Sequence, residues 1–158
     1  MRIQDAMTKE PVTCQADDAI SEVAGIMRSR KIGGIPVLDG DALVGIVTET
    51  DIIRLLMTKG PSDDLWLPSP LEIIELPVRE FFNWERTKTA LTDIRKKKIS
   101  EIMSRPVITI SPDDDVESAA GKMLEKKVDR LCVVKNDKLV GIITREDIVW
   151  SLAGGKDE

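Results

Sequence analysis

The sequence predicts an α/β (α+β) protein built from two copies of one unit. Each copy is expected to be a small mixed β-sheet packed on two helices, with a pseudo-twofold axis relating the two. Residues of the same type recur 96 positions apart: Met7 and Met103, Met27 and Met123, Gly45 and Gly141, and Asp51 and Asp147. The segment LVGIVTETDII, which begins at Leu43, also matches LVGIITREDIV, which begins at Leu139.

The repeat divides the chain into four parts. Residues 1–57 form the first copy, 58–98 a connecting insert, 99–153 the second copy and 154–158 a disordered tail. A unit of about 55 residues buries too little of its surface to be stable alone. We therefore expect the two copies to pack on each other.

The first helix of each copy is predicted from apolar residues at helical spacing. They recur at i, i+3, i+4 and i+7, as Ile20, Val23, Ala24 and Met27 in one copy and Val116, Ala119, Ala120 and Met123 in the other. Asp17 or Asp18 is expected to cap the first of these helices. Ser111 is expected to cap the second, with Pro112 as its first residue.

A strand hairpin and a second helix complete each copy. The apolar residues 35–38 and 131–134 indicate short buried strands, each followed by a polar turn at 39–41 or 135–137. The returning strands are residues 43–47 and 139–143. A helix is then expected to begin at Thr48 and at Thr144.

Composition narrows the classes of function. The formal charge of −5 disfavours a nucleic-acid binder, because phosphate contacts need a basic face. Cys14 and Cys132 form no C-x-x-C pair and the chain has no histidine, so neither a metal site nor a required cofactor is expected. No apolar run approaches the roughly 20 residues of a membrane span, which predicts a cytoplasmic protein.

Both copies contain the motif G-h-h-T-x-x-D, in which h is apolar, at Gly45–Asp51 and Gly141–Asp147. One interpretation is structural: the threonine caps a helix and the aspartate lies in its first turn, worth about 1 kcal/mol per helix. The other is functional, because a helix N-terminus directs free N–H groups at an anion. A phosphate would then lie beside the threonine, while an exposed aspartate carboxylate accepts both hydroxyls of a ribose.

With these motifs the chain resembles a pair of cystathionine-β-synthase-type (CBS) domains, a Bateman module, over residues 3–56 and 99–152. The resemblance implies two clefts between the repeats and ligands that contain adenosine. It leaves the ligand open among AMP, ADP, ATP, S-adenosylmethionine and their relatives. It also implies a homodimer.

The resemblance implies a role for particular residues. Asp51 and Asp147 are expected to bind ribose, and Thr48 and Thr144 phosphate. The walls against the base would be Ile46 and Ile142. The cleft that holds Asp51 would include, from the other copy, Thr109, Val128 and Arg130. The cleft that holds Asp147 would include Thr13, Ile32, Gly33 and Gly34.

The two clefts are expected to differ in charge. Arg130 matches a position at which the gamma subunits of AMP-activated protein kinase carry a phosphate-binding arginine, and its counterpart Gly34 has no charge. The Asp51 cleft would therefore prefer phosphorylated adenosine. Two positions depart from the family pattern, and these departures would diminish anion binding beside Arg130: Cys132 replaces a proline, and Asp129 replaces a basic or polar residue. A surface ion pair is the alternative role for Arg130.

The insert at residues 58–98 contains four of the five aromatic residues, Trp66, Phe81, Phe82 and Trp84. Its apolar residues are too numerous for a plain flexible linker. We expect it to pack on the module or on a second subunit, with docking of a partner protein as the alternative. Residues 78–97 are expected to be partly helical.

Three classes of function are compatible with this organisation to different degrees. The first is a non-catalytic regulatory module that binds an adenosyl ligand and signals to an unknown effector protein. The second is a ligand-free dimerisation or protein-interaction module that uses the aromatic insert. An enzyme is disfavoured, because the sequence has no Walker motif, nucleophile elbow or histidine for acid–base catalysis.

Overall fold

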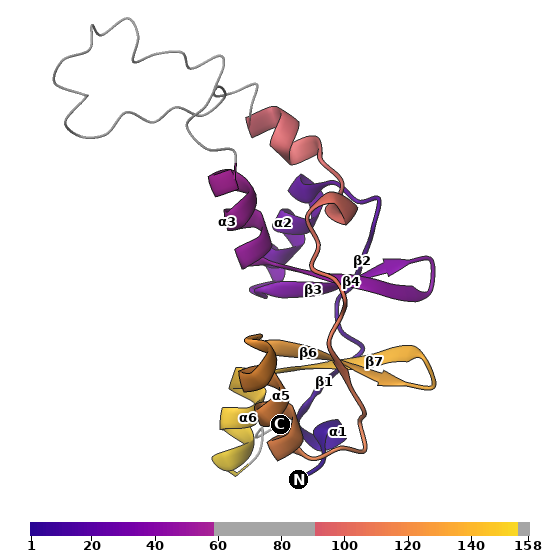
Figure 1. Cartoon of the computed structure of the whole chain (residues 1–158), viewed down its shortest axis with the longest axis vertical. Coiled ribbons are helices and arrows are strands. Elements are labelled where there is room, and N and C mark those ends of the chain that lie inside the picture. Colours follow the sequence, from indigo (N-terminus) through magenta and orange to yellow (C-terminus); the bar gives the residue numbers. More distant parts are fainter. Residues whose placement is uncertain (59–90, 155–158) are drawn as a thin grey trace, which may run out of the picture. The chain divides into compact units, whose positions relative to one another are not determined.

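The computed structural model describes residues 1–58 and 91–154 (Figure 1). The described part of the first copy contains α1 (Ile3–Ala6), β1 (Thr8–Lys9), β2 (Cys14–Gln15), α2 (Ile20–Arg30), β3 (Gly34–Asp39), β4 (Ala42–Thr48) and α3 (Glu49–Thr58). The second copy contains the 3-10 helix η2 (Ile99–Glu101), β5 (Thr109–Ile110), α5 (Val116–Lys126), β6 (Arg130–Lys135), β7 (Lys138–Thr144) and α6 (Arg145–Leu152). The predicted order strand, helix, strand, strand, helix is confirmed in both copies.

The strands form two small sheets, as predicted. One has the order β2-β3-β4 and the other β1-β7-β6-β5. In each sheet, the strand before the first long helix runs parallel to the strand after it: Cys14 of β2 pairs with Val37 of β3, and Thr109 of β5 with Cys132 of β6. Strands β6 and β7 are antiparallel, with Leu131 opposite Ile143. The second sheet is therefore mixed.

The predicted turns close both hairpins. Asn136 and Asp137, between β6 and β7, both have positive φ, at 51° and 61°. Two such residues form the loop that matches the twist of paired strands. Gly40 has a φ of 62° at the equivalent turn, where a glycine meets no steric cost.

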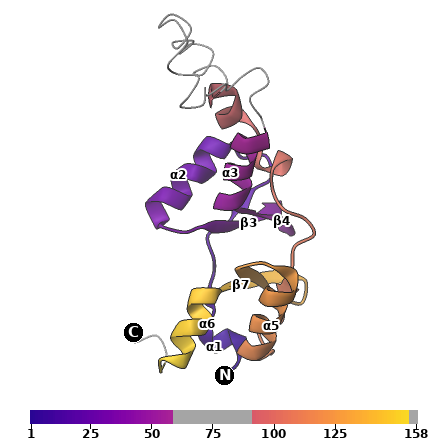
Figure 2. The same ribbon diagram turned by 60° about the vertical axis from the view of Figure 1, so that its left-hand side comes forward.

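The chain divides into two compact units, which interleave along the sequence. One comprises Met1–Ala16, Ile35–Ile46 and Ser104–Glu158, and the other Asp17–Gly34 and Val47–Met103. In the first unit, α1, α5 and α6 contact one another and cover one face of the sheet that contains β6 and β7 (Figures 1 and 2). The buried core beneath them is made by Ile3, Ala6, Ile110, Val116, Ala119, Met123, Leu131, Val133 and Ile143.

The leading segments of the two copies are exchanged. Strand β1 of the first copy pairs with β7 of the second, with Thr8 opposite Ile142. At the equivalent position of the second copy, Ser104 forms a bridge with Ile46 of the first. Each copy thus lends a short edge segment to the hairpin of the other, which the sequence analysis did not anticipate.

The helix caps differ from those predicted. The residue before α2 is Ala19, and it makes no side-chain capping bond, so neither Asp17 nor Asp18 caps that helix. Helix α5 is capped by Asp115, which accepts from the Ser118 N–H at 2.7 Å, rather than by Ser111.

The physical reason lies in the bonds made upstream of each helix. The Asp18 carbonyl accepts from the Ile99 N–H at 2.9 Å, which ties that residue to the second copy. Ser111 and the buried Pro112 lie in a turn closed by an Asp114 N–H bond to the Ser111 carbonyl at 3.2 Å. The apolar helical faces are as predicted, with Ile20, Val23, Met27, Val116, Ala119 and Met123 buried.

Most of the insert, including its four aromatic residues, lies outside the described residues. Its last part is described: residues 91–96 are helical, and Ile94 is buried. This agrees with the helix expected toward the end of the insert.

Candidate functional site: two capped helix starts

The two T-x-x-D motifs lie where an apolar strand ends and a helix begins. Thr48 is the last residue of β4 and precedes α3, and Thr144 is the last residue of β7 and the N-cap of α6. Val47 and Ile143 are fully buried immediately before each threonine. Burial of the strand therefore fixes the position at which each helix starts.

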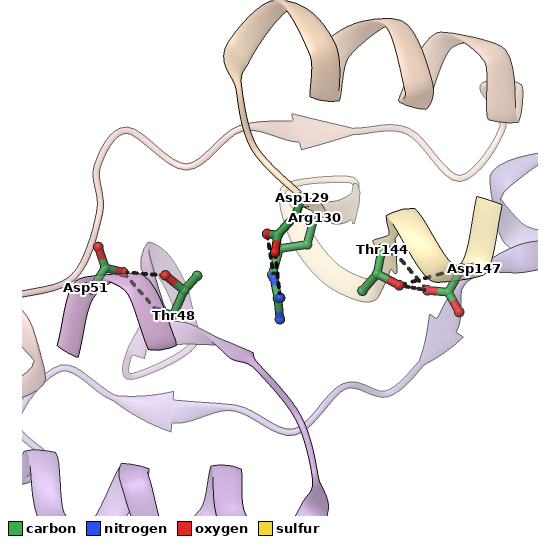
Figure 3. Close-up of polar contacts among 6 residues, drawn as sticks. All are labelled: Thr48, Asp51, Asp129, Arg130, Thr144 and Asp147. Atoms are coloured by element: carbon green, nitrogen blue, oxygen red, sulfur yellow. Dashed lines mark hydrogen bonds and ion pairs between the residues drawn. The ribbon is translucent and has the colours of Figure 1, made fainter. Parts of the chain in front are cut away.

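In the first copy the Asp51 carboxylate folds back onto Thr48 (Figure 3). Its Oδ2 accepts from the Thr48 backbone N–H at 2.9 Å and from the Thr48 hydroxyl at 3.2 Å. The Arg54 guanidinium lies 4.0 Å from Oδ1 of the same carboxylate. The first two turns of α3 thus bring an aspartate and an arginine together with the threonine that ends β4.

The second copy repeats this geometry. Asp147 Oδ2 accepts from the Thr144 N–H at 2.9 Å and from the Thr144 hydroxyl at 2.9 Å (Figure 3). The Thr144 oxygen in turn accepts from the Asp147 N–H at 3.3 Å. This is a reciprocal capping box. The structural interpretation of the motif is therefore confirmed.

Both aspartates are buried, which corrects the exposed carboxylates expected from the sequence. Asp51 and Asp147 are each 5% exposed. Hydrogen bonds to the strand end turn each carboxylate back toward the backbone, and a buried carboxylate needs such donors to offset its lost hydration. Each carboxylate is thus held in a defined position.

Arg130, the expected phosphate-binding residue, is paired with its neighbour Asp129. Nε and Nη2 of the guanidinium each donate to one carboxylate oxygen at 3.0 Å (Figure 3). The Arg130 side chain is 15% exposed and that of Asp129 55%. The hydrogen bond from Arg130 holds the pKa of Asp129 below its ordinary value, against the opposing effect of partial burial. The ion pair considered as an alternative for Arg130 is therefore present.

The pair lies beside the second capped helix start. Arg130 is the cross-strand partner of Thr144, and the Asp129 carbonyl accepts from the Arg145 N–H at 3.0 Å. In the first copy the Gly33 carbonyl accepts in the same way from the Glu49 N–H, at 3.1 Å. This backbone hydrogen bond is thus the same in both copies, but the side chains differ. The second copy has Asp129, Arg130 and Arg145 where the first has Gly33, Gly34 and Glu49.

The remaining predicted site residues lie at strand ends and in the loops that lead into strands. Ile142 is buried in β7, Gly34 is buried at the start of β3, and Thr109 is exposed at the start of β5. The partly buried ones are Thr13, Ile32, Gly33, Ile46 and Val128. Asp51 and Arg130 belong to different compact units, so their grouping into one ligand site stays a prediction.

Sequence reasoning treated Asp129 as a departure from the family pattern that diminishes anion binding beside Arg130, but it missed the pairing of the two side chains. Adjacent residues of opposite charge were the available signal.

Cys132, the other departure from the family pattern, is buried in β6, and burial raises the pKa of its thiol to about 12. Within residues 1–58 and 91–154, no group of three or more histidine, cysteine, aspartate or glutamate side chains could hold a metal ion. Those same residues include no helix long and apolar enough to cross a membrane.

Two repeats with a strand-to-helix T-x-x-D turn in each define a tandem α/β repeat protein. The chain belongs to the CBS domain family, which matches residues 3–58 and 99–154. CBS domains are themselves non-catalytic.

Relatives and solved structures agree with this assignment. The chain is 38% identical over 154 residues to the uncharacterized protein MJ1426 of Methanocaldococcus jannaschii, covering 96% of this chain and 91% of that protein. It is similar to the CBS domain of a CBS domain containing membrane protein from Sphaerobacter thermophilus, with 32% identity, a TM-score of 0.69, and coverage of 95% of this chain and 86% of that one. A third match is the CBS domain pair of protein MJ0100 in complex with 5′-methylthioadenosine and S-adenosyl-L-methionine. Its identity is 28%, its TM-score 0.71, and its coverage 98% of this chain and 97% of that one.

Proposed function

We propose that this chain is a non-catalytic regulatory module that binds an adenosyl ligand and signals to a separate effector protein. The observation that carries the proposal is the twofold occurrence of the T-x-x-D helix start with the same hydrogen bonds in both copies. A carboxylate held rigidly beside a helix N-terminus suits a ribose next to a polar or anionic group. The similarity to a CBS domain pair in complex with two adenosyl compounds supports the same ligand class.

The proposed ligand residues form two sets. Asp51 and Asp147 would accept from ribose hydroxyls, each beside its own threonine. The first set is Ile46, Thr48, Asp51, Thr109, Val128 and Arg130. The second set is Thr13, Ile32, Gly33, Gly34, Ile142, Thr144 and Asp147. Regulation requires that a ligand favour one arrangement of the module over another, because equal affinity for both shifts nothing.

We also propose that the module is a homodimer that associates through its second helices. Helices α3 and α6 leave apolar side chains exposed at equivalent positions, 56% for Ile53 and 63% for Val149. Leu56 and Leu152 form a second equivalent pair, 42% and 81% exposed. Exposed apolar residues in the same place on both copies are what a symmetric interface needs.

Isothermal titration tests the proposal directly. AMP, ATP, 5′-methylthioadenosine and S-adenosylmethionine are titrated into the protein and into the Asp51→Ala and Asp147→Ala variants. We expect at least one ligand to bind, and one of the two substitutions to abolish its heat. Because each aspartate also accepts hydrogen bonds from the threonine at its helix start, its loss could weaken that helix. Asp115→Ala is the matched control: it removes the cap of α5, outside either set.

Two results would overturn the proposal. One is the absence of heat with every ligand on a protein whose circular dichroism is that of a folded chain. The other is an Asp115→Ala variant that loses binding as completely as the T-x-x-D variants, because the effect would then come from loss of a helix cap. The first result would favour the ligand-free interaction module.

A further inference from the structure

We propose that Asp129 is a specificity-determining residue, which turns the Arg130 site away from phosphate and toward adenosyl compounds with an uncharged or cationic 5′ group. This inference rests on the proposed function, because it concerns the ligand that Arg130 contacts. Sequence reasoning favoured phosphate at this site. The ion pair in the structure argues for the opposite preference.

One edge of the Arg130 guanidinium is already engaged by Asp129. A guanidinium recognises phosphate best through two parallel N–H bonds from one edge of its planar fork. Here one such edge, Nε with Nη2, already donates to both carboxylate oxygens of Asp129, at 3.0 Å each. A phosphate that used this edge would have to displace a charged partner that belongs to the protein itself.

The charge of the Asp129 carboxylate also opposes a phosphate at Arg130. Asp129 has a pKa below its ordinary value because Arg130 donates to it, so the carboxylate is ionised at neutral pH. It cancels the charge of Arg130 and would lie close to any phosphate bound at the remaining N–H groups of the guanidinium. Two like charges in contact disfavour each other. A 5′-thioether experiences no such repulsion, and a sulfonium is attracted to the carboxylate.

The Asp129–Arg130 pair is held in place by the backbone around it. Arg130 begins β6 opposite Thr144, and the Asp129 carbonyl accepts from the Arg145 N–H at 3.0 Å. The backbone on both sides of the pair is therefore tied to β7 and α6. With its side chain 15% exposed, Arg130 has little room to swing away from Asp129. The first copy has no such device, because glycines occupy the equivalent positions, 33 and 34.

The test compares two ligands that share adenosine and differ at the 5′ position. AMP and 5′-methylthioadenosine are titrated into the protein and into Asp129→Asn, which keeps the size of the side chain and removes its charge. We expect the unchanged protein to prefer methylthioadenosine. We expect Asp129→Asn to bind AMP about tenfold more tightly, with methylthioadenosine changed less than about twofold.

Two further variants separate specificity from folding and from general charge. The double variant Asp129→Asn with Arg130→Gln should lose the gain in AMP affinity, because Asp129 acts through Arg130. Glu117→Gln removes the same charge from an exposed residue of α5 and should leave the ratio of the two affinities unchanged. A purely structural role for Asp129 would weaken both ligands together.

The outcomes distinguish this inference from the function on which it rests. If methylthioadenosine binds but Asp129→Asn leaves the affinity ratio unchanged, or weakens AMP, the inference is overturned and the adenosyl module stands. Weaker AMP binding would mean that Asp129 orients Arg130 for phosphate. If neither ligand binds to the protein or to any variant, the proposed function itself fails.

Discussion

The backbone N–H of Ile3 donates to the carbonyl oxygen of Asp114 at 2.9 Å, which joins the first helix of the chain to the second copy. The equivalent bond runs from Ile99 to the Asp18 carbonyl, also at 2.9 Å. Both isoleucines are fully buried. The leading segment of each copy is therefore an integral part of the other.

Truncation of Ile3 should destabilise the protein although the residue lies near the chain terminus. We expect Ile3→Ala to lower the free energy of unfolding by about 2–5 kcal/mol, because it empties a fully buried site in the core beneath α5. Urea unfolding followed by circular dichroism measures this change. Leu124→Ala, on an exposed side chain of α5, is the control and should change stability by about 0.5 kcal/mol or less. A loss below about 1 kcal/mol for Ile3→Ala would contradict the exchanged arrangement.

Gly141 should not tolerate a methyl group. A Cβ there would clash with the Met7 sulfur and lie 3.0 Å from the Thr8 carbonyl oxygen, where β1 pairs with β7. We expect Gly141→Ala to cost about 1–3 kcal/mol through overpacking. Gly121→Ala is the matched control, because its Cβ meets nothing within 4 Å and alanine favours the helix α5. Equal effects of the two substitutions on the urea midpoint would refute the close approach of β1.

Burial of Cys132 predicts a loss of stability at alkaline pH. Its thiol pKa is raised from 9.0 to about 12 in the folded protein, so between these values the unfolded chain releases a proton that the folded chain keeps. This contribution is fully present below pH 9.0 and is lost as the pH rises toward about 12, by about 1.4 kcal/mol per unit. Urea midpoints at pH 8, 9 and 10, compared with those of Cys132→Ala, isolate the effect. Parallel curves for the two proteins would contradict it.

The proposed dimer should depend on the exposed apolar residues of α3 and α6. A charge at Ile53 and at Val149, introduced as the double variant Ile53→Asp with Val149→Asp, should shift the protein from dimer to monomer in sedimentation velocity. Burying two unpaired carboxylates in an apolar interface costs more than the contact contributes. Leu124→Asp, at an exposed apolar residue of α5, should leave the mass unchanged. Dissociation by the control alone would assign the interface to α5 instead.

Much of each copy was predictable from local pattern. Helical spacing identified the buried residues Val23 and Met123, and the polar turns identified both hairpins. The T-x-x-D motif predicted the capped start of α6 at Thr144, because a cap needs only residues within one turn of helix. These patterns depend only on residues close together in the sequence, so they can be recognised without knowledge of the fold.

The errors arose where local chemistry offered several solutions. Asp17, Asp18 and Ser111 are all good capping residues, but Asp18 bonds to Ile99 of the second copy, and Ser111 lies in a local turn with Asp114. Asp115 caps α5 instead. The burial of Asp51 and Asp147 followed from the way each carboxylate folds back on its strand, which residue type alone does not reveal.

The sequence by itself determined the repeat, the order of elements in each copy, the two helix starts and the family. Only the tertiary structure decided that β1 joins β7 and that Ile3 bonds to the second copy, because these contacts link residues more than a hundred positions apart. It also decided that the guanidinium of Arg130 faces Asp129. A flexible side chain has many possible partners, and the burial and backbone register of the folded state select one of them.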